Sequence, residues 1–230
     1  MRERNVKITM IEKLLNHVAP HPCFVCGEIN ANFCSYCKYD IESESFFGCI
    51  VCGEASRGGV CDQHGESYVR AWVVGERRAG LRRLIDAYKF ERASALSSAL
   101  ASLLDVRLPY LPPSTIVVPV PSRSSQIRKR GYDHTLLVAG AFARLRNLDL
   151  RQPFEAVSHI SQHETESKTE RQEQARSAFR LIGPIDSTRP YIVIDDVVTT
   201  GATLSVLGGL LAEAGVSERW VAALARQPLD

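Results

Sequence analysis

The segment from Tyr191 to Thr203 constrains the fold more than any other part of the 230-residue chain, and it reads Tyr-Ile-Val-Ile-Asp-Asp-Val-Val-Thr-Thr-Gly-Ala-Thr. Its apolar, mostly β-branched opening is typical of a strand buried on both faces of a parallel sheet. Two carboxylates follow, then a turn of small and hydroxyl residues, and then leucines at helical spacing. This order predicts a strand–turn–helix unit of an α/β protein.

Residues 199–203, which we call the hydroxyl turn, have the composition of a phosphate site. The start of a helix presents free N–H groups and the positive end of the helix dipole. Gly201 allows a ligand to approach the backbone closely, and the threonines add hydroxyl donors. Asp195 and Asp196 would repel a phosphate, so they are expected to hold another part of the ligand, such as ribose hydroxyls or a bound Mg²⁺. The ligand implied is a sugar phosphate.

All seven cysteines lie between residues 20 and 65, in an internal repeat. Cys-X-X-Cys-Gly-Glu occurs twice, and each copy is followed by a second ligand pair with the same two-residue gap. Two intervening residues let a tight turn aim both side chains at one ion, and four such ligands favour a closed, structural Zn²⁺ site. The predicted ligands are Cys23, Cys26, Cys34 and Cys37 in the first repeat, and Cys49, Cys52, Cys61 and His64 in the second.

The repeat favours one zinc ion per copy, although a cross-braced pairing, or a single zinc with a degenerate second set, would use the same residues. A loop-rich segment of this size cannot fold on its own apolar core, so we expect metal to hold it together. The chain then divides into an N-terminal amphipathic helix at 1–19, a zinc-binding module at 20–66 and an α/β domain at 67–230.

Composition narrows the class of protein. A net charge of +2 and a hydrophobic content of 45% fit a globular protein and give no argument for binding polyanions over the whole surface. The chain has no run of eighteen apolar residues, and its first residues lack the apolar core of a signal peptide. We therefore expect a cytoplasmic protein without membrane insertion, whose cysteines stay reduced.

Another buried strand, besides the one that opens the 191–203 segment, is predicted at 115–121, and basic side chains follow it. Arg123, Arg128, Lys129 and Arg130 suit a pyrophosphate group at the carboxyl end of that strand. The basic helix near 77–89 is either a solvated face or a surface for polyphosphate or nucleic acid.

The rest of the chain continues the alternation of strands and helices. A helix is predicted at 93–104 and a last strand at 217–225, which would close the sheet. Residues 151–180, with His159 and His163, are predicted to form a mobile or partly helical excursion over the active site. Alternation from 69 to 225 predicts a parallel sheet flanked by helices.

The 191–203 segment resembles the signature of type I phosphoribosyltransferases, which bind 5-phosphoribosyl-1-pyrophosphate (PRPP). The resemblance implies a phosphoribosyltransferase-like fold, ribose hydroxyls held by Asp195 and Asp196, and Mg²⁺ bound with PRPP. It also implies a cradle for the 5′-phosphate made by Val198, Thr199, Thr200, Gly201, Ala202 and Thr203.

The whole chain resembles the ComF family, whose members join an N-terminal zinc finger to a type I phosphoribosyltransferase domain. The cysteine pairs, the 191–203 segment and residues 171–179 carry this resemblance, together with Tyr88-Lys89-Phe90, Pro119-Val120-Pro121 and Arg130-Gly131-Tyr132. It implies a cytosolic role in DNA uptake during natural transformation, on single-stranded DNA and with a competence helicase as partner.

The chain departs from related sequences at three places. Tyr132, Asp133 and His134 stand where the family commonly has Phe, Asn and Gln, and His64 stands where a cysteine often closes the second set. Thr199 occupies the position where purine phosphoribosyltransferases often have a general-base aspartate, so base activation of that kind is not expected.

Two functions fit these features. One is Mg²⁺-dependent transfer of ribose-5-phosphate from PRPP to a nitrogen acceptor, with Asp195 and Asp196 orienting the ribose and with Arg123, Lys129 and Arg130 stabilising the departing pyrophosphate. The other is a non-catalytic competence factor that contacts single-stranded DNA through the zinc modules and basic helices. Such a factor would use the phosphate site to sense a ligand or to bind a nucleic-acid phosphate.

Overall fold

The computed structural model describes residues 22–29, 31–44, 46–91, 93–157 and 177–228. The predicted N-terminal helix at 1–19 lies outside the described residues. So does most of the predicted excursion at 151–180, including His159 and His163.

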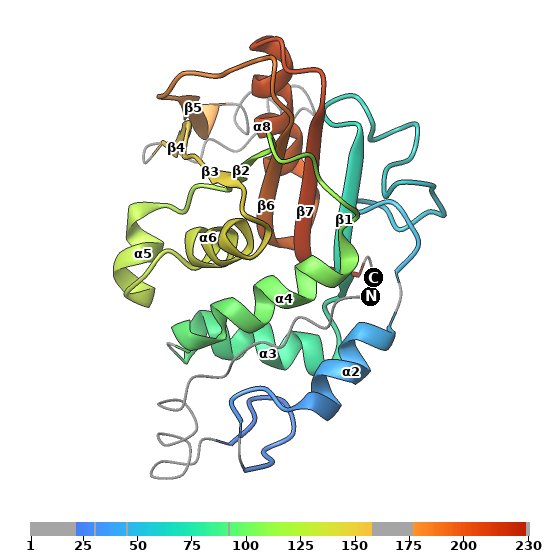
Figure 1. The fold of residues 1–230 in the computed structure, drawn as a ribbon, viewed down its shortest axis with the longest axis vertical. Helices are drawn as coiled ribbons and strands as arrows, with labels where there is room; N and C mark the ends of the chain where they lie inside the picture. Colours follow the sequence, from blue (N-terminus) through green and yellow to red (C-terminus); the bar gives the residue numbers. More distant parts are fainter. Residues whose placement is uncertain (1–21, 30, 45, 92, 158–176, 229–230) are drawn as a thin grey trace, which may run out of the picture.

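A five-stranded parallel sheet forms the centre of the protein, in the order β1-β7-β6-β2-β3 (Figure 1). This sheet confirms the predicted α/β class. We expected the last strand to close the sheet at its edge. Instead, it is inserted between β6 and β1. The strands are β1 (Arg70–Glu76), β2 (Ile116–Pro119), β3 (Asp149–Leu150), β6 (Tyr191–Val198) and β7 (Arg219–Arg226).

Strand β6 shows why the sheet is buried on both faces. Ile192 and Ile194 belong to a core shared with α3 (Ala79–Phe90), α4 (Ser97–Arg107) and α6 (His134–Arg146). Tyr191 and Val193 belong to a second core, shared with α8 (Ala202–Glu213). Alternate side chains of a strand point to opposite faces, so the unbroken apolar run supplies both layers. Figure 1 shows α8 and the α3–α4–α6 group on different sides of the sheet.

The remaining elements are short. They are α2 (Ser35–Ser43), the 3-10 turn η1 (Ser94–Leu96), α5 (Ser124–Arg130), and an antiparallel pair formed by β4 (Phe154–Ala156) and β5 (Phe179–Leu181). The helix predicted at 93–104 begins as η1 and continues as α4 to Arg107. Within the described part of the chain, no helix has both the length and the apolar character needed to cross a membrane.

The two cysteine repeats occupy different places on this framework. The first, drawn in blue in Figure 1, continues into α2 and lies near α3. The second precedes β1 in the chain and contacts it, since the backbone N–H of Ala71 donates to the carbonyl of Gly58 at 2.8 Å. Its residues Cys49, Ile50 and Val51 are buried in the same core as α8.

Helix α8 approaches the segment before β1 so closely that one of two adjacent glycines has no room for a side chain. A Cβ on Gly208 would lie 2.5 Å from the carbonyl oxygen of Ser67, whereas a Cβ on Gly209 would meet nothing within 4 Å. We expect Gly208→Ala to lower the free energy of unfolding by about 1–3 kcal/mol, because the helix must shift. Gly209→Ala should raise it by about 0.5–1 kcal/mol through helix propensity. Urea unfolding measures both, and equal effects would contradict this close approach.

Candidate ribose-phosphate site and metal-binding repeats

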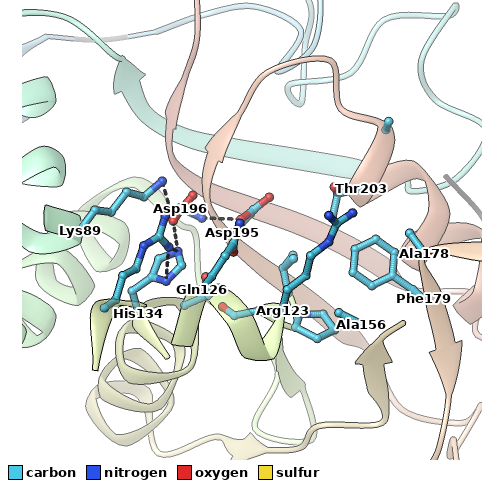
Figure 2. Close-up of a pocket in the computed structure, with 16 residues that line it drawn as sticks. Lys89, Arg123, Gln126, His134, Ala156, Ala178, Phe179, Asp195, Asp196 and Thr203 are labelled. Atoms are coloured by element: carbon cyan, nitrogen blue, oxygen red, sulfur yellow. Dashed lines mark hydrogen bonds and ion pairs between the residues drawn. The ribbon is translucent and has the colours of Figure 1, made fainter. Parts of the chain in front are cut away.

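A cavity of about 880 Å³ opens at the carboxyl ends of β2 and β6 (Figure 2). Ligands of open α/β sheets bind at this end of the strands. Side chains reach the cavity from the end of α3, the loop after β2, α5, the start of α6, the β4–β5 pair and the start of α8. The lining residues are Lys89, Val120, Pro121, Ser122, Arg123, Gln126, Arg130, His134, Thr135, Ala156, Ala178, Phe179, Asp195, Asp196, Ala202 and Thr203.

The structure brings together some of the predicted site residues and leaves others apart. Those that line the cavity are Asp195, Asp196, Arg123, Arg130, Ala202 and Thr203. Thr199 and Thr200 are exposed beside it, and Val198 is buried in the core under α8. Arg128 and Lys129 are exposed on α5 and do not belong to the lining.

The hydroxyl turn has the backbone geometry of a helix start. Gly201 has a φ of +72°, in the left-handed region that favours glycine, and α8 begins at the next residue. The N–H of Ala202 donates to Oγ1 of Thr200 at 3.4 Å. Because Ala202 and Thr203 line the cavity, the end of α8 that carries unpaired N–H groups lies at the cavity wall.

Asp196 is buried and is paired with two side chains from different helices. The Nζ atom of Lys89, at the end of α3, lies 2.7 Å from its Oδ2, and Nε2 of His134, at the start of α6, contacts the same oxygen (Figure 2). Burial alone would raise the pKa of Asp196, but the His134 hydrogen bond and the Lys89 charge outweigh it and hold that pKa at about 2. The Asp196 carboxylate is therefore ionised near pH 7, and its negative charge is compensated by Lys89 and His134.

Asp195 stands in a different electrostatic environment. Its carboxylate accepts a hydrogen bond from the backbone N–H of Asp196 at 2.8 Å. Burial, followed by the negative charge of Asp196, raises the pKa of Asp195 to about 7, against the smaller opposing effects of that hydrogen bond and of Lys89. Near neutral pH this carboxyl can therefore both donate and accept hydrogen bonds.

His134 lies between Asp196 and Arg130, whose Nη1 is 2.8 Å from Nδ1 of the imidazole. The same Nη1 atom lies 3.0 Å from Nε2, so the arginine contact does not single out one ring nitrogen. The ionised Asp196 carboxylate can only accept, so Nε2 of His134 is assigned as the donor to Asp196. The backbone around it is also held, because the hydroxyl of Tyr88 donates to the His134 carbonyl at 2.7 Å. The hydroxyl of Tyr132 in turn donates to the Tyr88 carbonyl.

Sequence reasoning did not place Lys89 or His134 in the site. Lys89 belongs to a segment singled out for its resemblance to the ComF family, and His134 stands where the chain departs from that family. Neither position indicates a partner, since Asp196 lies far along the chain. The unusual Asp133 is explained locally. It caps α6, where its carboxylate accepts from the N–H of Leu136 at 3.1 Å and from the hydroxyl of Ser122 at 2.9 Å.

Each cysteine repeat gathers its own four ligand atoms, all within 4.8 Å of one another. Sulfur atoms are 3.7 Å apart between Cys26 and Cys34, and also between Cys52 and Cys61. A tetrahedral zinc ion with Zn–S bonds of about 2.3 Å requires sulfur separations of about 3.8 Å. In the second repeat, Nδ1 of His64 lies 3.1 Å from the sulfur of Cys61. Both sets therefore fit zinc, and the ligands group by repeat instead of cross-bracing.

The two Cys-X-X-Cys turns share one backbone hydrogen-bond pattern. The N–H of Gly27 donates to the Cys23 carbonyl, and the N–H of Gly53 donates to the Cys49 carbonyl, both at 2.8 Å. The two glycines have φ values of +81° and +82°. The last position of each turn has a left-handed backbone conformation, and this explains why glycine recurs there in the sequence repeat.

Fold and site together define an α/β protein with a cavity lined by carboxylates, cations and the start of a helix. No family model matches the chain. The chain is 28% identical over 208 residues to Competence protein F of Haemophilus influenzae, covering 84% of this chain and 90% of that protein. It is 28% identical over 225 residues to DNA utilization protein YhgH of Escherichia coli K12, covering 90% and 97%. These relatives confirm the predicted resemblance to ComF-type proteins.

Solved structures also include similar chains. The allosteric regulatory enzyme of purine biosynthesis matches 57% of this chain with a TM-score of 0.40 and 16% identity, and the match covers 25% of that enzyme's chain.

The raised pKa of Asp195 predicts a pH-dependent stability. Between about pH 4 and 7 the folded protein keeps a proton that the unfolded chain has lost, so this carboxyl lowers the free energy of unfolding as pH rises. Asp195→Asn should therefore stabilise the protein at pH 8 by on the order of 1–3 kcal/mol, and much less at pH 5.

Denaturant unfolding at the two pH values is the measurement, and Asp196→Asn is the contrasting variant. That change leaves Lys89 and His134 without their partner and should destabilise the protein by about 3–5 kcal/mol. A stabilisation by Asp195→Asn that does not change with pH would contradict the assigned environment.

Separate metal sets predict separate losses of zinc. We expect about two Zn²⁺ per wild-type chain by elemental analysis, and about one per chain in either Cys26→Ala or His64→Ala, because each variant disables a single set. A cross-braced arrangement would instead weaken both sites in each variant. Loss of both ions on one substitution would contradict the observed grouping.

Proposed function

We propose that the protein binds PRPP or a closely related ribose phosphate in the cavity at the ends of β2 and β6. The observation that carries this proposal is one cavity lined by the paired carboxylates, the start of α8 and two arginines, Arg123 and Arg130. Carboxylates suit ribose hydroxyls, whereas a helix start and guanidinium groups suit phosphates. A ligand with hydroxyls between phosphate groups matches both kinds of contact.

Each residue then has a distinct role. Asp195 holds a ribose hydroxyl, and Asp196 offers its Oδ1, since Lys89 and His134 both contact Oδ2. The N–H groups and hydroxyls of residues 199–203 hold the 5′-phosphate. Arg123 and Arg130 face the pyrophosphate, which enters with Mg²⁺ as part of the ligand.

The reaction we propose is transfer of ribose-5-phosphate to a nitrogen acceptor. The bond from the ribose C1 to the pyrophosphate oxygen breaks as the bond from C1 to nitrogen forms. Charge develops on the leaving pyrophosphate, where the guanidinium groups of Arg123 and Arg130 stabilise it. The relatives named for competence and DNA utilization support a setting in the handling of incoming DNA, with single-stranded DNA and a helicase as candidate partners.

Calorimetric titration of PRPP with Mg²⁺ into the zinc-loaded protein tests the proposal. We expect saturable binding by the wild type and at least tenfold weaker binding by Asp195→Asn, because the amide cannot offer a carboxylate to the ribose. Glu218→Gln is the matched control: it removes one carboxylate from an exposed position before β7, at the opposite end of the strands from the cavity. Its affinity should equal that of the wild type.

Failure of the folded, zinc-loaded wild type to bind PRPP would refute this proposal and favour the second candidate, a protein that binds single-stranded DNA. The observation behind that candidate is the exposed basic face of α5, with Arg128 and Lys129. Beside it Arg130 lies over the exposed ring of Phe90, 5.8 Å from the ring centroid. Aromatic rings next to cations can stack bases, and binding through phosphates would weaken steeply with salt.

A further inference from the structure

The two cysteine repeats dock on the α/β domain through the same kind of contact. The residue before the second cysteine of each Cys-X-X-Cys turn is a valine, and each valine packs against a glycine at the start of a helix. A Cβ built on Gly80 would lie 3.1 Å from Cγ1 of Val25. A Cβ built on Gly201 would lie 2.5 Å from Cγ2 of Val51. Both glycines therefore let a metal-binding turn approach a helix end.

An arginine fastens each turn at the same point. Nη1 of Arg83 donates to the carbonyl of Val25 at 3.0 Å, and Nη2 of Arg226 donates to the carbonyl of Val51 at 3.3 Å. In each repeat, the same valine thus contacts the domain through both its side chain and its backbone carbonyl.

The second contact differs from the first in what it touches. Gly80 lies near the start of α3, at the opposite end of that helix from Lys89, whereas Gly201 belongs to the hydroxyl turn itself. The three atoms nearest to a Cβ at Gly201 all belong to Val51. The side chains of Thr199 and Thr200 are exposed, so Val51 supports this turn from its buried side.

The second repeat is held firmly enough to act as that support. Val51 is 9% exposed and shares a core with Val198 and Leu204, on either side of the hydroxyl turn. Arg226 is buried, and its Nη1 forms an ion pair with Glu76 at 2.7 Å. The Arg226 guanidinium is buried and bound to both Val51 and Glu76. It therefore leaves the second Cys-X-X-Cys turn little freedom to move relative to the ends of β1 and β7.

We propose that Val51 is a positioning residue through which the second metal-binding repeat fixes the hydroxyl turn. The proposal rests on the proposed function for the role of that turn in phosphate binding. Val51 lies between Cys49 and Cys52, so its place depends on the gathering of the second ligand set. Metal in the second set then holds the phosphate cradle in shape, and metal in the first set does not reach it.

Amide hydrogen exchange of peptides covering residues 198–204 tests this coupling without any ligand. Val51→Ala removes the contact, and Val25→Ala makes the same change at the equivalent position of the first repeat. We expect exchange in these peptides to rise about tenfold in Val51→Ala and to stay unchanged in Val25→Ala, with β6 protected in both. Val51→Thr keeps both γ atoms, and it should restore protection even if its buried hydroxyl lowers overall stability.

A second measurement uses the metal sets directly. His64→Ala should raise exchange at 198–204 as Val51→Ala does, whereas Cys26→Ala should not. Equal effects of the two repeats, or wild-type protection in Val51→Ala, would overturn the proposal.

Binding of ribose 5-phosphate separates this inference from the proposed function. We expect the affinity to fall about tenfold in Val51→Ala and to recover in Val51→Thr. If the wild type binds neither ribose 5-phosphate nor PRPP while the exchange results hold, the proposed function fails and the coupling stands. If the wild type binds both and exchange does not respond to Val51, the coupling fails and the proposed function stands.

Discussion

The buried charge of Asp196 is the interaction on which the arrangement of the cavity depends. A carboxylate removed from water costs several kcal/mol unless cations or donors compensate it. Here the compensation comes from the end of α3 and the start of α6, so neutralising one side chain aligns two helices with the tip of β6. Burial, together with this charge, raises the pKa of Asp195, and the two adjacent carboxyls thereby acquire different protonation behaviour.

The second cysteine repeat extends this arrangement to the other side of the sheet. Neither repeat has an apolar core of its own, yet Ile50 and Val51 of the second are buried in the core of the α/β domain. A repeat of this kind relies on the domain for its burial, and metal bound by its four ligand residues would fix its internal shape. Its position between β1 and the start of α8 makes it part of the cavity's support.

The fold class and the ligand sets were predictable because their signals are local: an unbroken apolar strand, a glycine turn, and cysteines at a fixed gap. The pairing of Asp196 with Lys89 and His134 was not, because it joins three distant segments and depends on how helices pack. Arg130 and Lys129 look equivalent in sequence, but neighbours on a helix point about 100° apart, and only Arg130 lines the cavity. Strands β4 and β5 are too short to show a period. The roles of the site residues stay predictions.

The position of β7 has a consequence for the order in which the protein assembles. This strand follows the other described strands in sequence, yet it lies between β6 and β1, and among the described residues β1 pairs with β7 alone. During synthesis the second cysteine repeat and β1 leave the ribosome long before α8 and β7, the elements that receive them, exist. Such long-range pairing slows folding. The three thiols of the second repeat therefore stay undocked through most of translation, and early capture of metal would shield them from oxidation.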